Sequence, residues 1–401
     1  MKINSIKNIS FKGYDAAPLK NLYMLSFVDR GQSNVRRELT KIGEKENFNV
    51  AIEFDGNLYA KEETPQKIDG GIYYKWSQDN KVFMNNGVNS YLLTPVNQRR
   101  TKYENQLGNI LGIETKKSKT IFAGGNIFLG KKQDGEKYIL IGEDVIEETA
   151  INEHFAEYGF FVNNTQEIDN IKNGKILEDD DSYGIFPTKK EFEERKEEYL
   201  ERAKSVISDD FDVKKENIFV VPQQEFHIDM FLRPIGYPYI LVNSEEKAKE
   251  LVQNNLGFSE EDSDILSETQ RYYSLQKKGK DVINTDEVIE ALKLQGFEPI
   301  EIGGIFGLDG MANFMNAVVN KHQDGTITYI TTSTKCEKED YSKLEKQFDK
   351  QLKEKVPNLK RIYHIHGGRA GQINIMMENL LELSGGLHCL TCEEPNFETW
   401  A

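Results

Sequence analysis

Short apolar runs rich in β-branched and aromatic residues recur along the chain and alternate with segments of helical pattern. The runs predict buried strands and lie at 138–142, 218–221, 239–242, 326–332 and 361–366. The segments with helical pattern lie at 188–207, 245–252, 286–295 and 337–355. Strands and helices mixed in this way predict an α/β fold.

The clearest of the expected helices follows Pro187. Thr188 and Glu191 have the spacing of a capping box, and the apolar residues from Phe192 to Ile207 then recur on one helical face. An acidic loop precedes this helix, and no linker rich in Pro, Gly or Ser divides the chain. We therefore expect one domain over 1–401, with a helical insertion at about 165–210.

The chain has 401 residues, of which 38% are hydrophobic, so it is long enough to bury a sizeable core. Its net charge excludes one class of function. Its 66 acidic and 51 basic side chains leave a formal charge of -15. Binding to a nucleic-acid backbone needs clustered Lys and Arg, so we expect no nucleic-acid partner, whereas a small cation would be attracted.

The cysteine content and the hydropathy predict a reduced, cytoplasmic protein. Three cysteines, Cys336, Cys389 and Cys392, cannot form a disulfide framework for a chain of this length. The amino-terminal residues lack the apolar stretch of a signal peptide, and no window of 18 apolar residues exists. We therefore expect no membrane association.

Cys389 lies in the segment SGGLHCLTCEEP, directly after two glycines and a histidine. A nucleophilic thiol needs an open backbone approach and an electropositive neighbour, which the glycines and His388 can supply. The alternative is a small buried apolar residue, since free cysteines are usually buried. Cys392 completes a C-x-x-C spacing, which also allows a redox pair or an inhibitory disulfide.

Two further segments carry polar residues that could share a site. His227 and Asp229 are two residues apart in VPQQEFHIDMFLRP. If this segment is extended, both side chains project from one face, although a strand-edge ion pair is the alternative. Upstream, YYKWSQDNKVFM places Asp79 behind Trp76 in a run with strand character. By itself, this aspartate is typical of a turn.

The order and content of these three segments resemble the guanidine-modifying members of the pentein superfamily. These are the arginine, agmatine and protein-arginine deiminases, the dimethylarginine hydrolases and the amidinotransferases. The matching residues are Trp76-Ser77-Gln78-Asp79, His227-Ile228-Asp229 and Gly385-Gly386-Leu387-His388-Cys389-Leu390-Thr391. The resemblance implies a pentein α/β propeller of five ββαβ-type units around a central active-site pocket.

The same resemblance implies a catalytic set of Cys389, His227, Asp229 and Asp79. A guanidinium is planar and cationic, so paired carboxylates such as Asp79 and Asp229 can hold it by charge-assisted hydrogen bonds. Cys389 would attack the central carbon, and His227 would protonate the departing amine and then activate water. The expected substrate-binding residues are Asp79, Asp229, Trp76, Asn126 and His388.

One departure from the superfamily pattern bears on the substrate. Arginine and agmatine deiminases usually carry E-G-G in the segment that here reads Phe122-Ala123-Gly124-Gly125-Asn126, so a carboxylate is missing at Ala123. Protein-arginine deiminases manage with two aspartates, and their H-x-D-x-F motif matches residues 227–231. The resemblance therefore favours deimination of peptidyl-arginine to citrulline, with release of ammonia.

Other substrates and roles stay open. The first alternative is an agmatine or free-arginine deiminase, and the second is an amidinotransferase or a non-catalytic binding pentein. The expected partner is a guanidino compound, the reaction requires no metal or organic cofactor, and the calcium sites of vertebrate protein-arginine deiminases are not carried over. The oligomeric state is left open.

Weaker signals have simpler interpretations. The glycine clusters at 303–307 and 367–371 lack the spacing of nucleotide-binding loops and predict tight turns. His364 and His366 share a strand face, but no third metal ligand is evident, so a hydrogen-bonded pair is expected.

Overall fold

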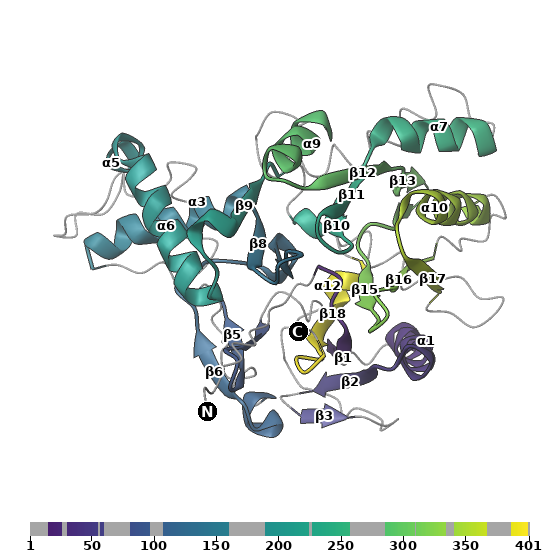
Figure 1. Ribbon diagram of the computed structural model, residues 1–401, viewed down its shortest axis with the longest axis horizontal. Helices are drawn as coiled ribbons and strands as arrows, with labels where there is room; N and C mark the ends of the chain where they lie inside the picture. The colour runs from purple at the N-terminus through teal and green to yellow at the C-terminus, as the bar shows by residue number, and fades with distance from the viewer. Residues whose placement is uncertain are drawn as a thin grey trace.

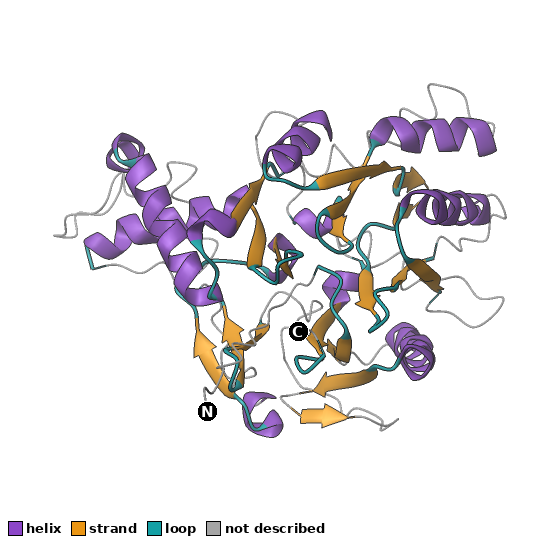
Figure 2. Cartoon of the chain, in the orientation of Figure 1, coloured by secondary structure: helices purple, strands orange, loops and turns teal. Residues whose placement is uncertain are grey.

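The mixed α/β architecture predicted from the sequence is confirmed by the computed structural model (Figure 2). The structure describes residues 15–25, 30–54, 57–59, 81–96, 107–159, 189–223, 227–256, 285–308, 310–333, 341–366 and 386–399. All five expected strands form, as do the four expected helices wherever they fall within these ranges.

Within the described residues, five sheets share one pairing pattern. In each, two strands pair antiparallel and a third strand pairs parallel to the second. Four of these sheets contain β4 (Val82–Asn85), β5 (Ser90–Thr94) and β6 (Glu114–Lys117); β7 (Ile127–Lys131), β8 (Lys137–Gly142) and β9 (Ile218–Val221); β10 (Leu232–Pro234), β11 (Tyr239–Asn243) and β12 (Glu298–Ile302); and β15 (Val318–Lys321), β16 (Ile327–Thr332) and β17 (Leu359–Ile365).

The fifth sheet brings together the two ends of the described chain. Its strands are β18 (Thr391–Pro395), β1 (Leu19–Leu25), β2 (Asn49–Phe54) and β3 (Asn57–Tyr59). β18 pairs antiparallel with β1, so that Thr391 is opposite Met24 and Cys392 is opposite Tyr23. This pairing fixes the segment that directly follows Cys389.

Helices connect the parallel strands because a parallel crossover needs a long connection. They are residues 107–111, α1 (Arg30–Glu46), α3 (Glu143–Glu157), α5 (Lys189–Glu194), α6 (Lys196–Phe211), α7 (Glu245–Leu256), α9 (Thr285–Leu294) and α10 (Tyr341–Lys355). In Figure 1 the helices α1, α7, α9, α10 and the α5–α6 pair lie at the edge of the molecule. A separate hairpin consists of β13 (Ile305–Leu308) and β14 (Gly310–Asn313), and Gly303 and Gly304 connect β12 to it.

The expected propeller goes further than these pairings. No sheet closes on itself among the described residues, so the five-unit propeller stays a prediction, as do the single domain and the boundaries of its insertion. The helix expected after Pro187 is present but divided at Arg195, between α5 and α6. Tyr199, Ile207 and Phe211 of α6 are fully buried in the apolar cluster that also contains strands β7 and β8.

The apolar core also anchors the segment that carries the candidate nucleophile. Leu387 and Leu390 are fully buried in one cluster with Leu22 of β1, Val318 of β15 and Ile365 of β17. Because two sheets contribute to this cluster, the short helix that contains the two leucines is anchored against both. Among the described helices, none combines the length and the apolar character that a membrane span requires.

Candidate active site

Cys389 lies on α12 (Leu387–Leu390), a four-residue helix that leads directly into β18. The hydroxyl of Thr391 donates to the Leu387 carbonyl at 3.0 Å and closes the end of this helix. A Cβ on Gly386 would lie 2.7 to 2.9 Å from side-chain atoms of Asn316. Gly386 therefore allows a close approach between this segment and Asn316.

The extended conformation considered for the segment of His227 and Asp229 is not found beyond His227. Residues Ile228–Met230 form the 3₁₀ helix η3. Side chains replace the hydrogen bonds of a strand here: Asn126 Oδ1 accepts from the Ile228 N–H at 3.0 Å, and Asn313 Nδ2 donates to the Met230 carbonyl at 2.9 Å. These tertiary hydrogen bonds explain why strand-like residues adopt a tight turn.

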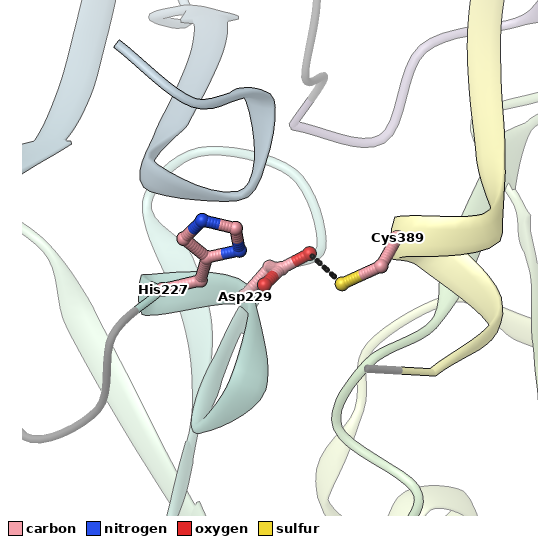
Figure 3. Close-up of side chains that lie close together, drawn as sticks. All are labelled: His227, Asp229 and Cys389. Atoms are coloured by element: carbon pink, nitrogen blue, oxygen red, sulfur yellow. Dashed lines mark hydrogen bonds between the residues drawn. The ribbon is translucent and has the colours of Figure 1, made fainter. Parts of the chain in front are cut away.

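The three side chains nevertheless converge, as Figure 3 shows. The reactive atoms of His227, Asp229 and Cys389 all lie within 4.8 Å of one another. Cys389 Sγ is 3.4 Å from Asp229 Oδ2, across a sequence separation of 160 residues. Among the described residues, these three side chains form the one group that could hold a metal ion.

Asp229 offers one carboxylate oxygen for a ligand. The residue is fully buried, and its Oδ2 accepts a hydrogen bond from His388 Nδ1 at 2.8 Å. Its Oδ1 is buried without a hydrogen-bond partner among the described residues. Because an unsatisfied buried carboxylate oxygen is costly, a cationic N–H donor would be bound favourably at this atom.

Aromatic and charged groups surround the ring of His388, which is almost completely buried. The ring stacks on Phe128 at 5.7 Å between centroids, and its Nε2 is 3.8 Å from Glu393 Oε2. Glu393 in turn forms a buried ion pair with Arg233 at 3.1 Å. The structure thus places His388 between two carboxylates, and its substrate-binding role stays a prediction.

Residues 123–126 form one wall of the site. They include the 3₁₀ helix η1 (Gly124–Asn126). A Cβ on Gly125 would lie 2.5 Å from His227 Nδ1 and 2.9 Å from Asp229 Oδ1, so a glycine is needed at this position. Asn126 Oδ1 accepts from Gln223 Nε2 as well as from the Ile228 N–H. Asn126 therefore positions the segment with His227, and its expected contact with substrate is untested.

Asn316 contacts the candidate nucleophile but was not identified as a site residue from the sequence. Its Nδ2 donates to Cys389 Sγ at 3.2 Å, and its Oδ1 accepts from the backbone N–H groups of His388 and Cys389. One sequence feature could have identified it: Asn313 and Asn316 lie within the otherwise apolar run 311–319. Amides buried in such a run need specific hydrogen-bond partners.

Trp76, Asp79 and Cys336 lie outside the described residues. Cys392 is buried in an apolar cluster with Tyr23 and Phe83, and neither it nor Cys389 forms a disulfide bond with a described residue.

The two strand histidines have different partners. His364 binds Asp349 through Nε2 and the Thr332 carbonyl through Nδ1, whereas the His366 backbone N–H donates to Glu38. The expectation that His364 is satisfied by hydrogen bonds is confirmed, and the glycine cluster at 367–371 lies outside the described residues.

Comparisons with known proteins extend this picture. No protein-family model matches the chain, and no curated protein sequence matches it. Among solved structures, agmatine deiminase of C. jejuni covers 96% of this chain with 95% of its own, at 15% identity and a TM-score of 0.51. A variant of the C. jejuni enzyme with substrate bound covers 96% of each chain, at 12% identity and a TM-score of 0.50. The fold of this chain is therefore similar to that of these agmatine deiminase structures.

Proposed function

We propose that this chain is a cysteine hydrolase of the deiminase type, which converts the guanidinium group of a small molecule, agmatine foremost, to a ureido group. The observation that carries this proposal is the convergence of His227, Asp229 and Cys389 within 4.8 Å. A thiol, an imidazole and a carboxylate in one place provide a nucleophile, an acid-base group and a cation ligand.

Asp229 would hold the guanidinium. Its Oδ1 can accept a charge-assisted hydrogen bond from one guanidinium nitrogen, which places the central carbon beside Cys389. The neutralised carboxylate and the adjacent cation then favour the thiolate form of Cys389 over the thiol. Asp79, which the superfamily resemblance assigns to the same cation, would supply the second carboxylate.

The reaction would proceed through a covalent intermediate. The proton of Cys389 passes to His227, and the sulfur attacks the guanidinium carbon while the C=N π bond breaks. The C–N bond then breaks, His227 returns its proton to the departing nitrogen, and ammonia leaves behind an S-alkyl thiouronium. Neutral His227 next takes a proton from water, and the hydroxide adds to the same carbon while the C=N π bond breaks. The C–S bond then breaks with its electron pair going to sulfur, the new hydroxyl gives up its proton as the C=O bond forms, and that proton returns to Cys389, which leaves the ureido product.

The substrate is better described by the alternative interpretation of the sequence than by the first. Two solved structures with a similar fold are an agmatine deiminase and its substrate-bound variant, and they support a small guanidine as substrate. We therefore place a small guanidine first, with free arginine as the next substrate in order.

A substrate panel tests the proposal. The purified chain is incubated with agmatine, free arginine and an acyl-arginine amide, and both ammonia and ureido product are measured. We expect turnover of agmatine, with little or none of the blocked arginine. Absence of both products from every guanidine would refute the deiminase function, and preference for the blocked compound would restore the peptidyl-arginine interpretation. Product that forms only with an acceptor amine would indicate amidino transfer.

A further inference from the structure

We propose that Asn316 is a catalytic residue of this site, whose side-chain amide stabilises the negative charge on Cys389 Sγ. This inference rests on the proposed function, because it concerns the nucleophile of that reaction. It adds a residue that lies in none of the three motifs by which the site was recognised from the sequence. Asn316 is fully buried beside α12, and its Nδ2 lies 3.2 Å from Cys389 Sγ.

The orientation of the Asn316 amide is fixed by its other hydrogen bonds. Its Oδ1 accepts from the His388 N–H at 2.8 Å and from the Cys389 N–H at 3.2 Å. A flipped amide would turn its NH₂ group towards these two donors, which cannot accept a hydrogen bond. The NH₂ group must therefore face the sulfur.

A second asparagine holds Asn316 in place. Asn313 Oδ1 accepts from the backbone N–H groups of Met315 and Asn316, at 2.8 and 3.1 Å. Its Nδ2 donates to the Met230 carbonyl, and Asn316 Nδ2 lies 3.3 Å from the Asp229 carbonyl. Residues 313–316 thus connect the segment of Asp229 to that of Cys389. A donor held this rigidly needs no reorganisation when charge develops on the sulfur.

The charges around the sulfur make such a donor important. Asp229 Oδ2 lies 3.4 Å from Sγ, and a carboxylate at this distance disfavours the thiolate. His227 faces the same space from the N-terminal side of η3, while His388, Glu393 and Arg233 form the buried group behind α12. The Asn316 amide places the positive end of a dipole on the sulfur without adding a proton that could be lost.

The donor would act twice in the reaction. It stabilises the thiolate after the proton of Cys389 has passed to His227. It acts again when the C–S bond breaks and the electron pair returns to the sulfur, so that the thiolate leaves more readily. In both steps Asn316 keeps its own protons, and a loss of the amide should slow the reaction even if substrate binding is unchanged.

Asn316→Asp tests this inference, because the carboxylate can still accept from the two backbone N–H groups but cannot donate to the sulfur when ionised. The ionisation of Cys389 is followed by the ultraviolet absorbance of its thiolate against pH, with the Cys389→Ser chain as the blank. We expect the midpoint to rise by about one pH unit or more, a tenfold loss of thiolate, and kcat for agmatine to fall by roughly 10²-fold.

Asn320→Asp is the matched control. Asn320 is also buried, its Oδ1 accepts from the Leu19 N–H, and its Nδ2 donates to the Glu46 carbonyl, away from the site. The Asn320→Asp variant measures the effect of a new buried carboxylate away from the site. We expect the midpoint of Cys389 ionisation to stay at its original value in this variant.

Asn316→Ala removes the donor without adding charge and should raise the midpoint by a smaller amount. An unchanged Cys389 midpoint in the folded variants would overturn the inference, and so would unfolding of both variants, which would make Asn316 a purely structural residue. The thiolate measurement needs no turnover. A raised midpoint in a chain without guanidine activity would therefore refute the proposed function but still show that the Asn316 amide stabilises the Cys389 thiolate.

Discussion

His388 Nδ1 lies 2.8 Å from Asp229 Oδ2, although the two residues are 159 positions apart in the sequence. This hydrogen bond joins the residue directly before the proposed nucleophile to the proposed ligand of the guanidinium. It occupies one carboxylate oxygen and leaves Oδ1 without a hydrogen-bond partner among the described residues. In the proposed reaction, this one contact would therefore help to position both the guanidinium and the thiol.

Asp229→Asn should weaken guanidinium binding, because it removes the charge that faces the cation. A hydrogen bond to a charged group contributes about 1.5–3 kcal/mol, so we expect a roughly 10- to 100-fold rise in the Kd for agmatine. The control is Asp212→Asn, which removes the same charge at the end of α6, where Asp212 pairs with Lys137, and should leave the Kd unchanged. Each substitution is made in the Cys389→Ser chain, so that calorimetry measures binding without turnover. Equal affinity in the two variants would contradict the role of Asp229.

Gly125→Ala should reduce the rate without unfolding the chain. The added methyl group would meet side-chain atoms of His227 and Asp229, at 2.5 and 2.9 Å, and these can yield by rotating away. We expect kcat/KM for agmatine to fall by about 10²-fold, since a displacement of this size at a reacting group is costly. Gly135→Ala is the control: its φ of +82° strains an alanine by about 1–2 kcal/mol, but the site is distant. Full activity in Gly125→Ala would show that the close approach is not needed.

Cys392→Ser distinguishes a hydrolytic thiol from a redox pair. Cys392 is buried among apolar side chains, so a serine hydroxyl there should lower the free energy of unfolding by about 1–3 kcal/mol. The folded fraction should retain its kcat under strong reductant, whereas Cys389→Ser should lose turnover and keep its fold. If both serine variants are inactive although folded, the C-x-x-C pair is required and the hydrolase mechanism is wrong.

The sequence predicted local structure better than it predicted the details of the site. The apolar runs became strands β8, β9, β11 and β16 because burial on a sheet rewards that composition directly. The run at 361–366 also became a strand, β17, but the expectation that it is buried was wrong, since most of β17 is half-buried or exposed. The segment at 228–230 became a 3₁₀ helix because Asn126 and Asn313, far away in the sequence, satisfy its backbone. The residues of this segment alone therefore could not predict its 3₁₀ conformation.

Only the site residues that belong to a recognisable sequence motif could be predicted. His227, Asp229 and Cys389 were identified because their residue types and order match a guanidine site, and the structure brings them together. Asn316 carries no such signal. Its role depends on the packing of α12 against residues 313–316, which follows from the long-range pairing of β18 with β1.

The pH dependence of stability should contain a contribution from His364. Burial lowers its pKa, but the hydrogen bond to Asp349, the charge of Glu345 and the Thr332 carbonyl outweigh burial and hold the pKa above 6.5. A raised folded-state pKa stabilises the protein below the unfolded pKa, and this stabilisation is lost as the pH rises through the folded value. His364→Gln should therefore reduce the free energy of unfolding more at about pH 5.5 than at about pH 8.5.

His322→Gln provides a control of opposite sign. Burial and the charge of Lys360 lower the pKa of His322, so protonation destabilises the folded chain at low pH. Removing this histidine should cost less at the lower pH than at the higher one. The two variants are compared by denaturant unfolding at both values. A loss in His364→Gln that does not vary with pH would contradict the assigned pairing.

The central claim is that Cys389 forms a covalent bond to the guanidinium carbon, and intact-protein mass spectrometry of the His227→Ala chain tests it most directly. Without the imidazole that activates water, hydrolysis of the thiouronium should slow by about 10²–10⁴-fold, so the adduct should accumulate during incubation with agmatine. We expect a mass gain equal to agmatine less ammonia, located by peptide mapping on Cys389 and absent from the double variant with Cys389→Ser. Guanidine turnover that persists in the Cys389→Ser chain, or an adduct located on another residue, would contradict it.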